Sequence, residues 1–309
     1  MRTIDVEVLM SYYNGDRYIR EQIQSILDQT YSGMIKILIR DDGSTKTELQ
    51  QILNGIVYPP NRQIELIREE NLGPQKSFLR LIQLADQAEY YFYADQDDVW
   101  LEDKIENAVQ KMQEMQADVK LYCSNYKITD SDLQVLDESG VKLGDNTFQF
   151  LTALLFNTFP GCVMGMNAGL WKLLKEMNVK NCMMHDSYTF GTALAAGKVY
   201  YDARPGILHR IHQNNVVGYG FKKINPGKWI REKCSLLIHK EDYDLSEYAD
   251  RLLKIHGEEA LSFLGDVRIL RDFKKNSVCT WRLLRHPALK HKLDREAMSI
   301  YCKILFHLF

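Results

Sequence analysis

The stretch YYFYADQDDVW at residues 90–100 decides the fold class of the chain. Its first five residues are aromatic or apolar and predict a strand that is buried on both faces, as strands of parallel sheets are. An acidic run ends that strand abruptly. In open α/β sheets, ligands bind beyond the carboxyl ends of the strands. The stretch therefore predicts an α/β fold with an acidic ligand site at one strand end.

Three similar units precede this stretch. In each unit an apolar strand runs into a polar loop, and a helix with apolar residues at helical spacing follows. Four such units in a row predict a doubly wound, mostly parallel sheet. The expected strands cover residues 6–10, 35–39, 64–67 and 90–94.

Beyond residue 100 the pattern continues with helices and strands. A helix that includes Trp100 is expected directly after the acidic run, and a late strand is expected at residues 198–201. The segment around His209 is expected to be a loop. The last part of the chain is helical in pattern. We therefore expect an α/β domain over residues 1–225 and a helical extension over residues 226–309.

The composition is that of an ordinary globular protein, with 45% hydrophobic and 26% charged residues. Six cysteines without a C-x-x-C pair favour a reducing compartment over a disulfide framework. The first residues lack the features of a signal peptide. The longest uncharged run, residues 146–171, is interrupted by Pro-Gly, so no membrane-spanning helix is expected. Together these features predict a cytoplasmic protein.

Charge is distributed unevenly along the chain, whose net charge is -2. Residues 274–309 contain eight Lys or Arg and two acids, so this segment carries +6 and the remainder carries -8. An acidic body argues against nucleic acid as a partner. A basic segment with aromatic residues suits an anionic membrane surface. The sequence favours neither contact with a membrane nor packing against a second subunit, as in a homodimer.

The acidic run contains the pattern Asp95-x-Asp97. Carboxylates in a loop at a strand end are suitable ligands for a hard divalent cation such as Mg²⁺, which often takes only one or two of them. A solvated acidic turn that begins the next helix is the alternative. The chain has neither a G-x-G-x-x-G nor a Walker phosphate loop, so a dinucleotide site and a Walker site are unsupported.

Four motifs stand at the predicted strand ends: SYYNG (11–15), RDDGST (40–45), ENLG (70–73) and DQDDVW (95–100). In this order, with strand-helix units between them, they resemble glycosyltransferase family 2. The similarity extends over about residues 5–220 and is greatest to the rhamnosyltransferase-like branch of bacterial surface polysaccharide synthesis. It implies a GT-A fold, with a nucleotide-binding part at about 1–100 and an acceptor part at about 101–225.

The resemblance implies roles for matching residues. Asp41 would accept a hydrogen bond from the base of a uridine or thymidine nucleotide, and Tyr12 or Tyr13 would lie against that base. Asp95 would lie near the ribose and the metal, and Asp97 would bind the Mn²⁺ or Mg²⁺ that bridges the diphosphate. Turn capping and ordinary loop packing are the structural alternatives for these positions. The implied nucleotide-sugar site comprises Ser11, Tyr12, Tyr13, Asn14, Asp41, Asn71, Gly73, Asp95, Gln96 and Arg210.

The pair His185-Asp186 resembles the His-Asp at which the family places its catalytic base. Asp186 would take the proton from the acceptor hydroxyl, while a helix N-cap is its structural alternative. Many relatives continue with two tryptophans, whereas this chain has Ser187-Tyr188, which leaves the sugar pockets open. His212 would reach the metal or the diphosphate, and Arg210 would offset charge on the leaving group. A surface loop histidine is the alternative for His212.

The implied activity is an inverting, metal-dependent transfer of a sugar from a nucleotide-sugar donor. The expected donor is dTDP-L-rhamnose, and UDP-hexose or UDP-N-acetylhexosamine are the alternatives. The expected acceptor is a polysaccharide or a saccharide linked to polyprenyl diphosphate, reached at the inner face of the cell membrane. Outside this class, a sugar nucleotidyltransferase is disfavoured by the first loop, SYYNG, which is not glycine-rich. A catalytically inactive nucleotide-sugar-binding scaffold is the remaining alternative.

Overall fold

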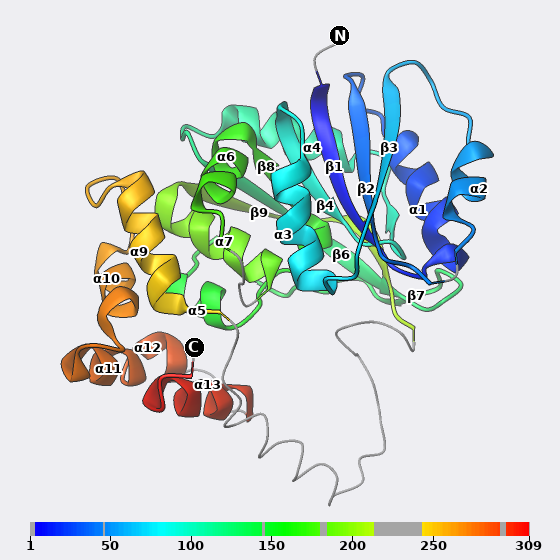
Figure 1. Cartoon of the computed structure of the whole chain (residues 1–309). Coiled ribbons are helices and arrows are strands. Elements are labelled where there is room, and N and C mark those ends of the chain that lie inside the picture. Colours follow the sequence, from blue (N-terminus) through cyan, green and yellow to red (C-terminus); the bar gives the residue numbers. More distant parts are fainter. Residues whose placement is uncertain are drawn as a thin grey trace, which may run out of the picture.

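The structure is a computed structural model that describes residues 4–45, 47–143, 146–179, 184–212, 243–290 and 295–308. Nine strands of these residues form one sheet (Figure 1). They are β1 (Ile4–Tyr12), β2 (Ile35–Asp42), β3 (Arg62–Glu69), β4 (Ala88–Ala94), β5 (Val99–Trp100), β6 (Lys120–Thr129), β7 (Val135–Asp137), β8 (Met164–Asn167) and β9 (Lys198–Arg210). Their spatial order is β3-β2-β1-β4-β8-β6-β9-β5, and β7 pairs with β6.

The first four strands confirm the predicted parallel sheet. β3, β2, β1 and β4 lie next to one another and run parallel. Beyond β4 the sheet is mixed, because β8 is antiparallel to both β4 and β6. β9 is parallel to β6, and the short β5 is antiparallel to β9. Most strands therefore point the same way, and the fold is α/β as predicted.

Helices cover both faces of the sheet (Figure 1). On one face, the rings of Phe78 and Tyr93 are in edge contact and those of Trp171 and Tyr91 are stacked. On the other face, the amine of Lys104 lies over the ring of Phe92. The helices before the C-terminal group are α1 (Asp16–Leu27), α2 (Leu49–Asn54), α3 (Pro74–Leu84), α4 (Lys104–Glu114), α5 (Phe150–Leu155), the 3-10 turn η1 (Gly161–Val163), α6 (Ala168–Met177) and α7 (His185–Ala196).

Local sequence explains where these helices begin and which face they bury. α1 buries Ile19, Ile23 and Ile26, which recur at a spacing of three or four residues. α3 begins at Pro74, whose fixed φ suits the first helical turn. The preceding Gly73 has φ 79, a left-handed conformation that glycine adopts without strain.

Two expectations about secondary structure are wrong. Trp100 lies in β5 rather than in a helix, because Val99 and Trp100 pair with the end of β9, and α4 begins only at Lys104. β9 does not end at residue 201 but continues to Arg210. Its pairing with β6 shifts register at residues 124–126, which lets a strand containing Pro205 stay in the sheet. This long strand carries His209 and Arg210 to the site described below.

The C-terminal part is helical as far as the structure describes it. The predicted boundary between residues 225 and 226 lies outside the described residues and stays a prediction. α9 packs against α6, and α10 packs against α9 and α11. No described helix is long and apolar enough to cross a membrane. The C-terminal helices are α9 (Leu245–His256), α10 (Leu264–Asp272), α11 (Ser277–Leu284), α12 (Pro287–Lys290) and α13 (Arg295–Leu305).

A buried ion pair joins β1 to β2. Glu7 and Lys36 are register neighbours, and Lys36 Nζ lies 3.1 Å from Glu7 Oε1. Burial raises the pKa of Glu7 from 4.5 to about 7, although the charge of Lys36 opposes the rise. Burial lowers the pKa of Lys36, but hydrogen bonds to Asp86 and Glu65 outweigh it and place the pKa above its ordinary value. Glu7 is therefore the group in this cluster that takes up a proton near neutral pH.

Replacing Glu7 with glutamine should remove a pH-dependent part of the stability. The folded state keeps the Glu7 proton up to about pH 7, so the stabilisation is complete below pH 4.5 and is lost as the pH rises through 7. A shift of this size corresponds to about 3 kcal/mol. The difference in unfolding free energy between wild type and Glu7→Gln, from urea denaturation at about pH 4 to 8, should fall accordingly. A difference that does not vary with pH would contradict the assignment.

Candidate functional site

The loops at the carboxyl ends of β1, β2 and β4 are tied together. The backbone N–H of Asn14 donates to Ser44 Oγ at 3.0 Å, and the N–H of Thr45 donates to Asn14 Oδ1 at 3.1 Å. On the other side, the N–H of Tyr13 donates to Gln96 Oε1 at 2.8 Å. The predicted convergence of these loops is therefore present, with Asn14 and Gln96 as the residues that connect them.

Asp41 lies at the end of β2 with its side chain almost fully buried. One carboxylate oxygen accepts the backbone N–H of Ser44 at 2.9 Å, so the turn-capping role is present. The other oxygen lies 3.2 Å from Arg68 Nε, and the Arg68 side chain is 61% exposed. An exposed arginine can move aside, which would leave this oxygen as an acceptor for a ligand. The role of Asp41 in base recognition stays a prediction.

The two tyrosines at the end of β1, Tyr12 in the strand and Tyr13 just after it, have different environments. Tyr12 is fully buried, and its hydroxyl bonds Asp16 and, at 2.7 Å, Thr47 Oγ1. Tyr13 is 44% exposed at the mouth of the loop. Of the pair, Tyr13 is therefore the residue with a ring surface that a ligand can contact.

The loop after β3 is shaped by a buried carboxylate. The backbone N–H groups of Leu72 and Gly73 donate to the Asp42 carboxylate at 2.8 and 2.9 Å. The side chain of Asn71 donates to the Asp42 carbonyl at 2.9 Å. Asn71 and Gly73 are thus held beside the end of β2, and contact with a nucleotide stays a prediction for both.

A buried arginine supports these loops from behind. Arg40 is fully buried and pairs with Asp42 and, at 2.9 Å, with Glu69. It also donates to Ser77 Oγ at 3.0 Å, and Ser11 Oγ lies 2.6 Å from the same oxygen. Sequence reasoning missed Arg40 and Asp42, because nothing in the motif distinguishes a buried ion pair from exposed charges. In the structure, Ser11 contributes to this network through its hydrogen bond with Ser77.

Three carboxylates crowd the loop after β4. Burial, and then the charges of Asp98 and Asp97, raise the pKa of Asp95 to about 7. Burial and the charge of Asp98 likewise raise the pKa of Asp97. Such a cluster stores electrostatic repulsion that a bound cation would relieve.

Asp97 faces a histidine that lies two residues beyond the end of β9. His212 Nε2 lies 2.7 Å from Asp97 Oδ2, and each side chain is 16% exposed. The His212 ring stacks on the ring of Tyr18 with centroids 5.2 Å apart. The structure therefore brings together the two residues predicted to hold the metal, Asp97 and His212, at the surface of the site.

Asp98 points the other way, into the protein. It is fully buried, and it accepts hydrogen bonds from His209 Nδ1 at 2.9 Å and from the backbone N–H of Arg210 at 3.2 Å. Burial lowers the pKa of His209, but the charge and hydrogen bond of Asp98 raise it to about 9. Burial raises the pKa of Asp98, and the charge of His209 more than reverses this. The two form a charged pair that fastens the acidic loop to β9.

Arg210 also holds the acidic loop against β9. Its guanidinium donates to the carbonyls of Asp97 and Ser131 at 2.9 and 2.7 Å and to Glu21 Oε2 at 2.6 Å. The guanidinium lies 4.2 Å from the centre of the Tyr18 ring. Arg210 is 2% exposed. It therefore holds the backbone of the acidic loop in this structure, and its contact with a leaving group stays a prediction.

Replacing His209 with glutamine should loosen the acidic loop and weaken metal binding by about 10- to 100-fold, as expected when the partner behind a metal ligand is lost. Mn²⁺ titration followed by electron paramagnetic resonance would measure the dissociation constant. His256→Gln, in α9, is the matched control and should bind Mn²⁺ like the wild type. Equal Mn²⁺ affinity in all three proteins would show that the Asp98–His209 pair does not position the predicted metal ligands, Asp97 and His212.

Asp186 lies in the first turn of α7, where the helix dipole favours a carboxylate. The N-cap is Met184, so Asp186 does not serve as the cap. Asn157 Nδ2 donates to Asp186 Oδ2 at 2.7 Å, and the N–H of Ser187 donates to Oδ1 at 2.7 Å. Asn157 was not predicted, since no motif connects it to Asp186.

The start of α7 rests on the end of β4. The His185 ring stacks on Phe78 with centroids 3.9 Å apart and meets the edge of Tyr93 at 4.9 Å. The Tyr93 hydroxyl also lies 2.9 Å from Thr189 Oγ1, one turn further along α7. Tyr93 precedes Asp95 by two residues. The structure therefore places Asp186 at the same end of β4 as the acidic loop.

Beneath the acidic loop lies a second buried group that sequence reasoning missed. The ligand atoms of Asp98, Cys162 and His209 lie within 4.8 Å of one another. Lys104 donates to the Cys162 carbonyl at 2.7 Å, and burial lowers the pKa of this lysine to about 8. Asp98 and His209 already bond each other, so the group supports the loop from inside. Its members come from separate elements and share no sequence pattern.

Residues 7–175, more than half of the chain, match the family described as glycosyl transferase family 2. The chain belongs to glycosyltransferase family 2. Among its relatives in this family is the dTDP-rhamnosyl transferase RfbG of Shigella flexneri, 30% identical over 74% of this chain and 83% of the relative. A glycosyltransferase of Rickettsia typhi without an assigned activity is 27% identical over 88% of this chain and 80% of the relative.

The fold of this glycosyltransferase is also that of solved structures. Staphylococcus aureus TarS, residues 1–349, in complex with UDP-GlcNAc aligns with a TM-score of 0.53 and 13% identity. The alignment covers 97% of this chain and 90% of that chain. At this identity the likeness concerns the fold alone. The predicted GT-A fold and family membership are thus confirmed.

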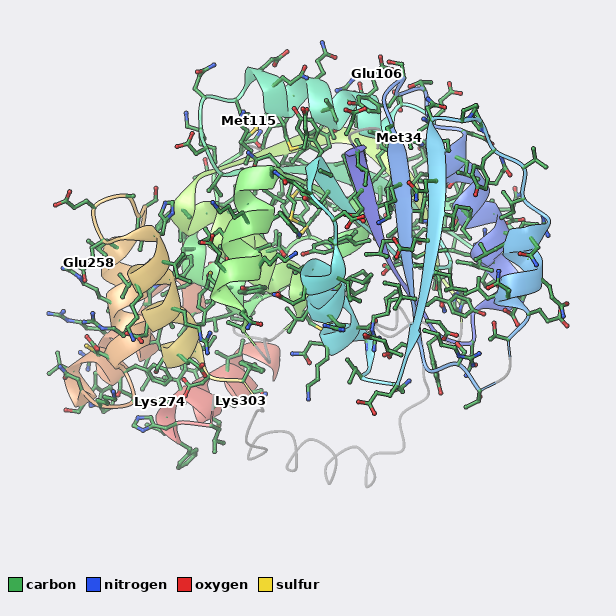
Figure 2. The ribbon with its side chains drawn as sticks, turned by 45° about the horizontal axis from the view of Figure 1, so that its top comes forward. Met34, Glu106, Met115, Glu258, Lys274 and Lys303 are labelled. Atoms are coloured by element: carbon green, nitrogen blue, oxygen red, sulfur yellow. The ribbon has the colours of Figure 1, made fainter. Side chains whose placement is uncertain are left out.

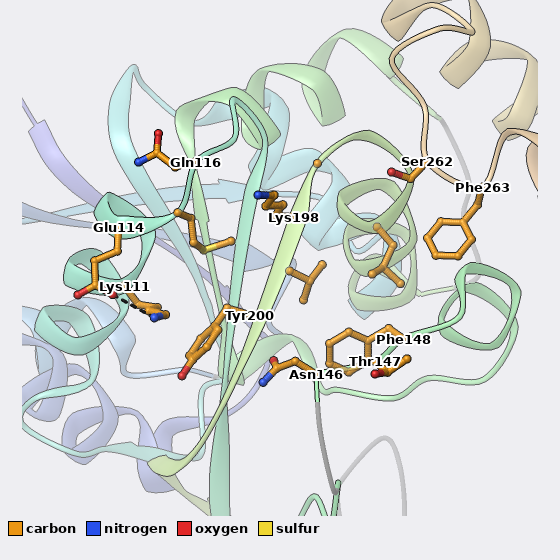
Figure 3. Close-up of a pocket in the computed structure, with 14 residues that line it drawn as sticks. Lys111, Glu114, Gln116, Asn146, Thr147, Phe148, Lys198, Tyr200, Ser262 and Phe263 are labelled. Carbon is orange, nitrogen blue, oxygen red and sulfur yellow. Dashed lines mark hydrogen bonds and ion pairs between the residues drawn. The ribbon is translucent and has the colours of Figure 1, made fainter.

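A separate cavity of about 680 Å³ lies near the start of β9 (Figure 3). Its lining includes Lys111, Tyr200 and Phe263. Tyr200 precedes Arg210 by ten residues of β9, which corresponds to about 30 Å of extended strand. This cavity is therefore remote from the acidic loop of the glycosyltransferase, and the site described above does not include it.

Proposed function

We propose that this family 2 enzyme transfers a sugar from a nucleotide donor to an acceptor hydroxyl with inversion. One observation carries the proposal: α7 rests on the end of β4, so the buried Asp186 and the Asp97–His212 pair share one end of the sheet. Convergence of a general base and a cation-binding pair at strand carboxyl ends is what such a transfer needs.

Asp186 acts as the general base in this proposal. The acceptor oxygen attacks the anomeric carbon and passes its proton to the Asp186 carboxylate. The bond between that carbon and the diphosphate oxygen breaks, and its electron pair leaves with the nucleoside diphosphate. The side chain of Asn157 and the N–H of Ser187 hold the two carboxylate oxygens in a fixed orientation. Because the base is already oriented, no free energy is needed to orient it during the reaction.

Asp97 and His212 would hold the divalent cation. Their carboxylate and imidazole lie together at the edge of a crowded acidic loop, which suits a cation. Mg²⁺ prefers oxygen ligands, so a set that includes an imidazole nitrogen fits Mn²⁺ better. When bound, the cation would neutralise charge on the departing diphosphate.

For the donor we propose dTDP-L-rhamnose, because RfbG, named as a dTDP-rhamnosyl transferase, is a relative over most of the chain. Asp41 and the exposed Tyr13 would bind the base. For the acceptor we propose a saccharide of a surface polysaccharide, free or carried on polyprenyl diphosphate.

A panel of donors tests this proposal. The protein is incubated with dTDP-L-rhamnose, UDP-glucose or UDP-N-acetylglucosamine and Mn²⁺ or Mg²⁺, and the released nucleoside diphosphate is measured. We expect release from dTDP-L-rhamnose with Mn²⁺, and release that is slower by about 10²- to 10⁴-fold with the Asp186→Asn variant. Release from a UDP-sugar alone would overturn the donor assignment. No release from any donor, with or without saccharide acceptors, would leave an inactive nucleotide-sugar-binding protein.

A further inference from the structure

We propose that one face of the C-terminal helices, formed by α11 and the end of α13, docks this protein on an anionic lipid bilayer. The proposal concerns where the enzyme works and does not depend on its donor. It is carried by three observations: large exposed apolar side chains, a local excess of positive charge, and the position of this face relative to the catalytic site.

The outward face of α11 combines apolar and cationic residues. Val278 and Trp281 are 56% and 58% exposed. Arg282 and Arg285 follow at helical spacing on the same face, whereas Leu283 is buried on the opposite face. The Arg285 guanidinium lies 5.7 Å from the centre of the Trp281 ring. An indole with a cation beside it suits the boundary between lipid headgroups and acyl chains.

The end of α13 extends this face. α11 packs against α13, and the rings of Phe273 and His307 lie in edge contact with centroids 5.8 Å apart. The end of α13 therefore lies beside the segment that leads into α11. There Leu305 and Phe306 are 52% and 61% exposed. α11 and the end of α13 therefore each expose a pair of large apolar side chains, the kind of residue that gathers at interaction sites.

Positive charge is concentrated on this part of the chain. Residues 273–290 contain five Lys or Arg and no acid, although the whole chain has a net charge of -2. Lys274 and Lys303 lie in the lower part of the helical group in Figure 2, and Lys274 pairs with Asp244 at 2.9 Å. The acidic remainder would be repelled by an anionic bilayer, so the molecule would approach it with this face first.

The same charge favours a membrane over a second copy of the chain. In a twofold dimer each face meets its own counterpart, so Arg282 and Arg285 of both copies would be brought together. Like charges across an interface are unfavourable. Anionic lipid supplies the opposite charge and also accepts the Trp281 ring.

The docked face lies at the same end of the molecule as the catalytic site. In Figure 1 the chain enters β1 at the top and the parallel strands run downward, and α11 and α13 lie at the lower left. Figure 2 agrees, from a view turned by 45°. Docking would therefore hold the strand carboxyl ends toward the bilayer, where a lipid-linked acceptor is presented.

Vesicle flotation of the full chain tests the proposal without any donor. Vesicles of phosphatidylcholine with or without phosphatidylglycerol are compared at about 0.05 M and about 0.5 M salt, because salt screens surface charge. We expect flotation with phosphatidylglycerol at the lower salt, and little with phosphatidylcholine alone. Arg282→Glu/Arg285→Glu should weaken partitioning at least about 25-fold, about fivefold for each charge removed. Trp281→Ser should weaken binding at both salt concentrations.

The matched control is Lys142→Glu/Lys172→Glu, which makes the same charge change at two side chains that are 72% exposed and belong to other elements. The control should float like the wild type. No flotation with phosphatidylglycerol at low salt, or equal loss in control and Arg282→Glu/Arg285→Glu, would overturn the proposal. So would a dimer in light scattering that Trp281→Ser dissociates. Donor turnover of the α11 variants in solution should stay normal, so failure here is distinguishable from failure of the transferase proposal.

Discussion

Asp186→Asn should lower the turnover number by about 10²- to 10⁴-fold, the usual contribution of a general base. The amide cannot accept the proton of the acceptor hydroxyl. It still fills the same space and can accept from Asn157, so the fold should survive. One of the two donors that now face the carboxylate, Asn157 or Ser187 N–H, would meet an NH₂ group. We expect that mismatch to cost about 1–3 kcal/mol of stability.

Steady-state kinetics and nucleotide titration together check this result. Donor binding in Asp186→Asn should match the wild type, because Asp186 is not predicted to touch the nucleotide. Asp202→Asn is a matched control: this buried carboxylate binds Tyr122 and Arg204 within β9 and β6, and its loss should leave turnover nearly unchanged. Turnover near the wild-type level in Asp186→Asn would show that another group accepts the proton.

Asp97→Ala should remove metal-dependent donor binding. The variant keeps His212 but loses the carboxylate that faces it, and a single imidazole is a weak anchor for Mn²⁺. Because a bound cation supplies several kcal/mol of charge stabilisation, we expect kcat/KM to fall by at least about 10²-fold. Titration of nucleoside diphosphate with and without Mn²⁺ measures the effect.

The control for this experiment is Asp118→Ala, at an exposed carboxylate just before the start of β6 and away from the strand carboxyl ends. That variant should bind nucleotide more tightly when Mn²⁺ is added, as the wild type does. In Asp97→Ala the added Mn²⁺ should make little difference. If Mn²⁺ strengthened nucleotide binding equally in both variants, Asp97 would not be a metal ligand.

The parallel part of the fold and the convergence of its loops could be predicted because both follow from local pattern. Buried strands that end in polar loops are visible in one sequence, and the geometry of parallel sheets brings those ends together. In the structure Asn14 and Gln96 connect neighbouring loops at this junction, and their contact with a nucleotide stays a prediction. The helix at 74–84, which follows the third predicted strand, was also visible from its apolar spacing.

The long β9 could not be predicted because its pattern is broken. Pro205 and Gly206 interrupt the strand, and it stays in the sheet only through a register shift against β6. For that reason His209 and Arg210 were expected in a loop. In the structure they belong to β9, which pairs with β6, and they hold the acidic loop through Asp98 and the Asp97 carbonyl.

The hydrogen-bond partners of buried polar residues could not be predicted from the sequence either. Arg40 is fully buried, and a buried arginine usually has a charged partner. That partner is Asp42, but nothing in the motif identifies Asp42 as the residue that pairs with Arg40. Asn157 bonds Asp186 across 29 positions of sequence, and Cys162 meets Asp98 across a larger interval. Such contacts are set by tertiary packing, which no local period encodes.

We propose that Asp41, Asp97 and Asp186 surround one nucleotide sugar and its cation. A crystal structure of the protein with dTDP and Mn²⁺, with anomalous scattering used to locate the metal, tests it most directly. We expect a manganese peak bound by Asp97 and His212, the base at Asp41, and Asp186 facing the open side of the diphosphate. Manganese elsewhere, or Asp186 separated from the diphosphate by protein, would contradict it.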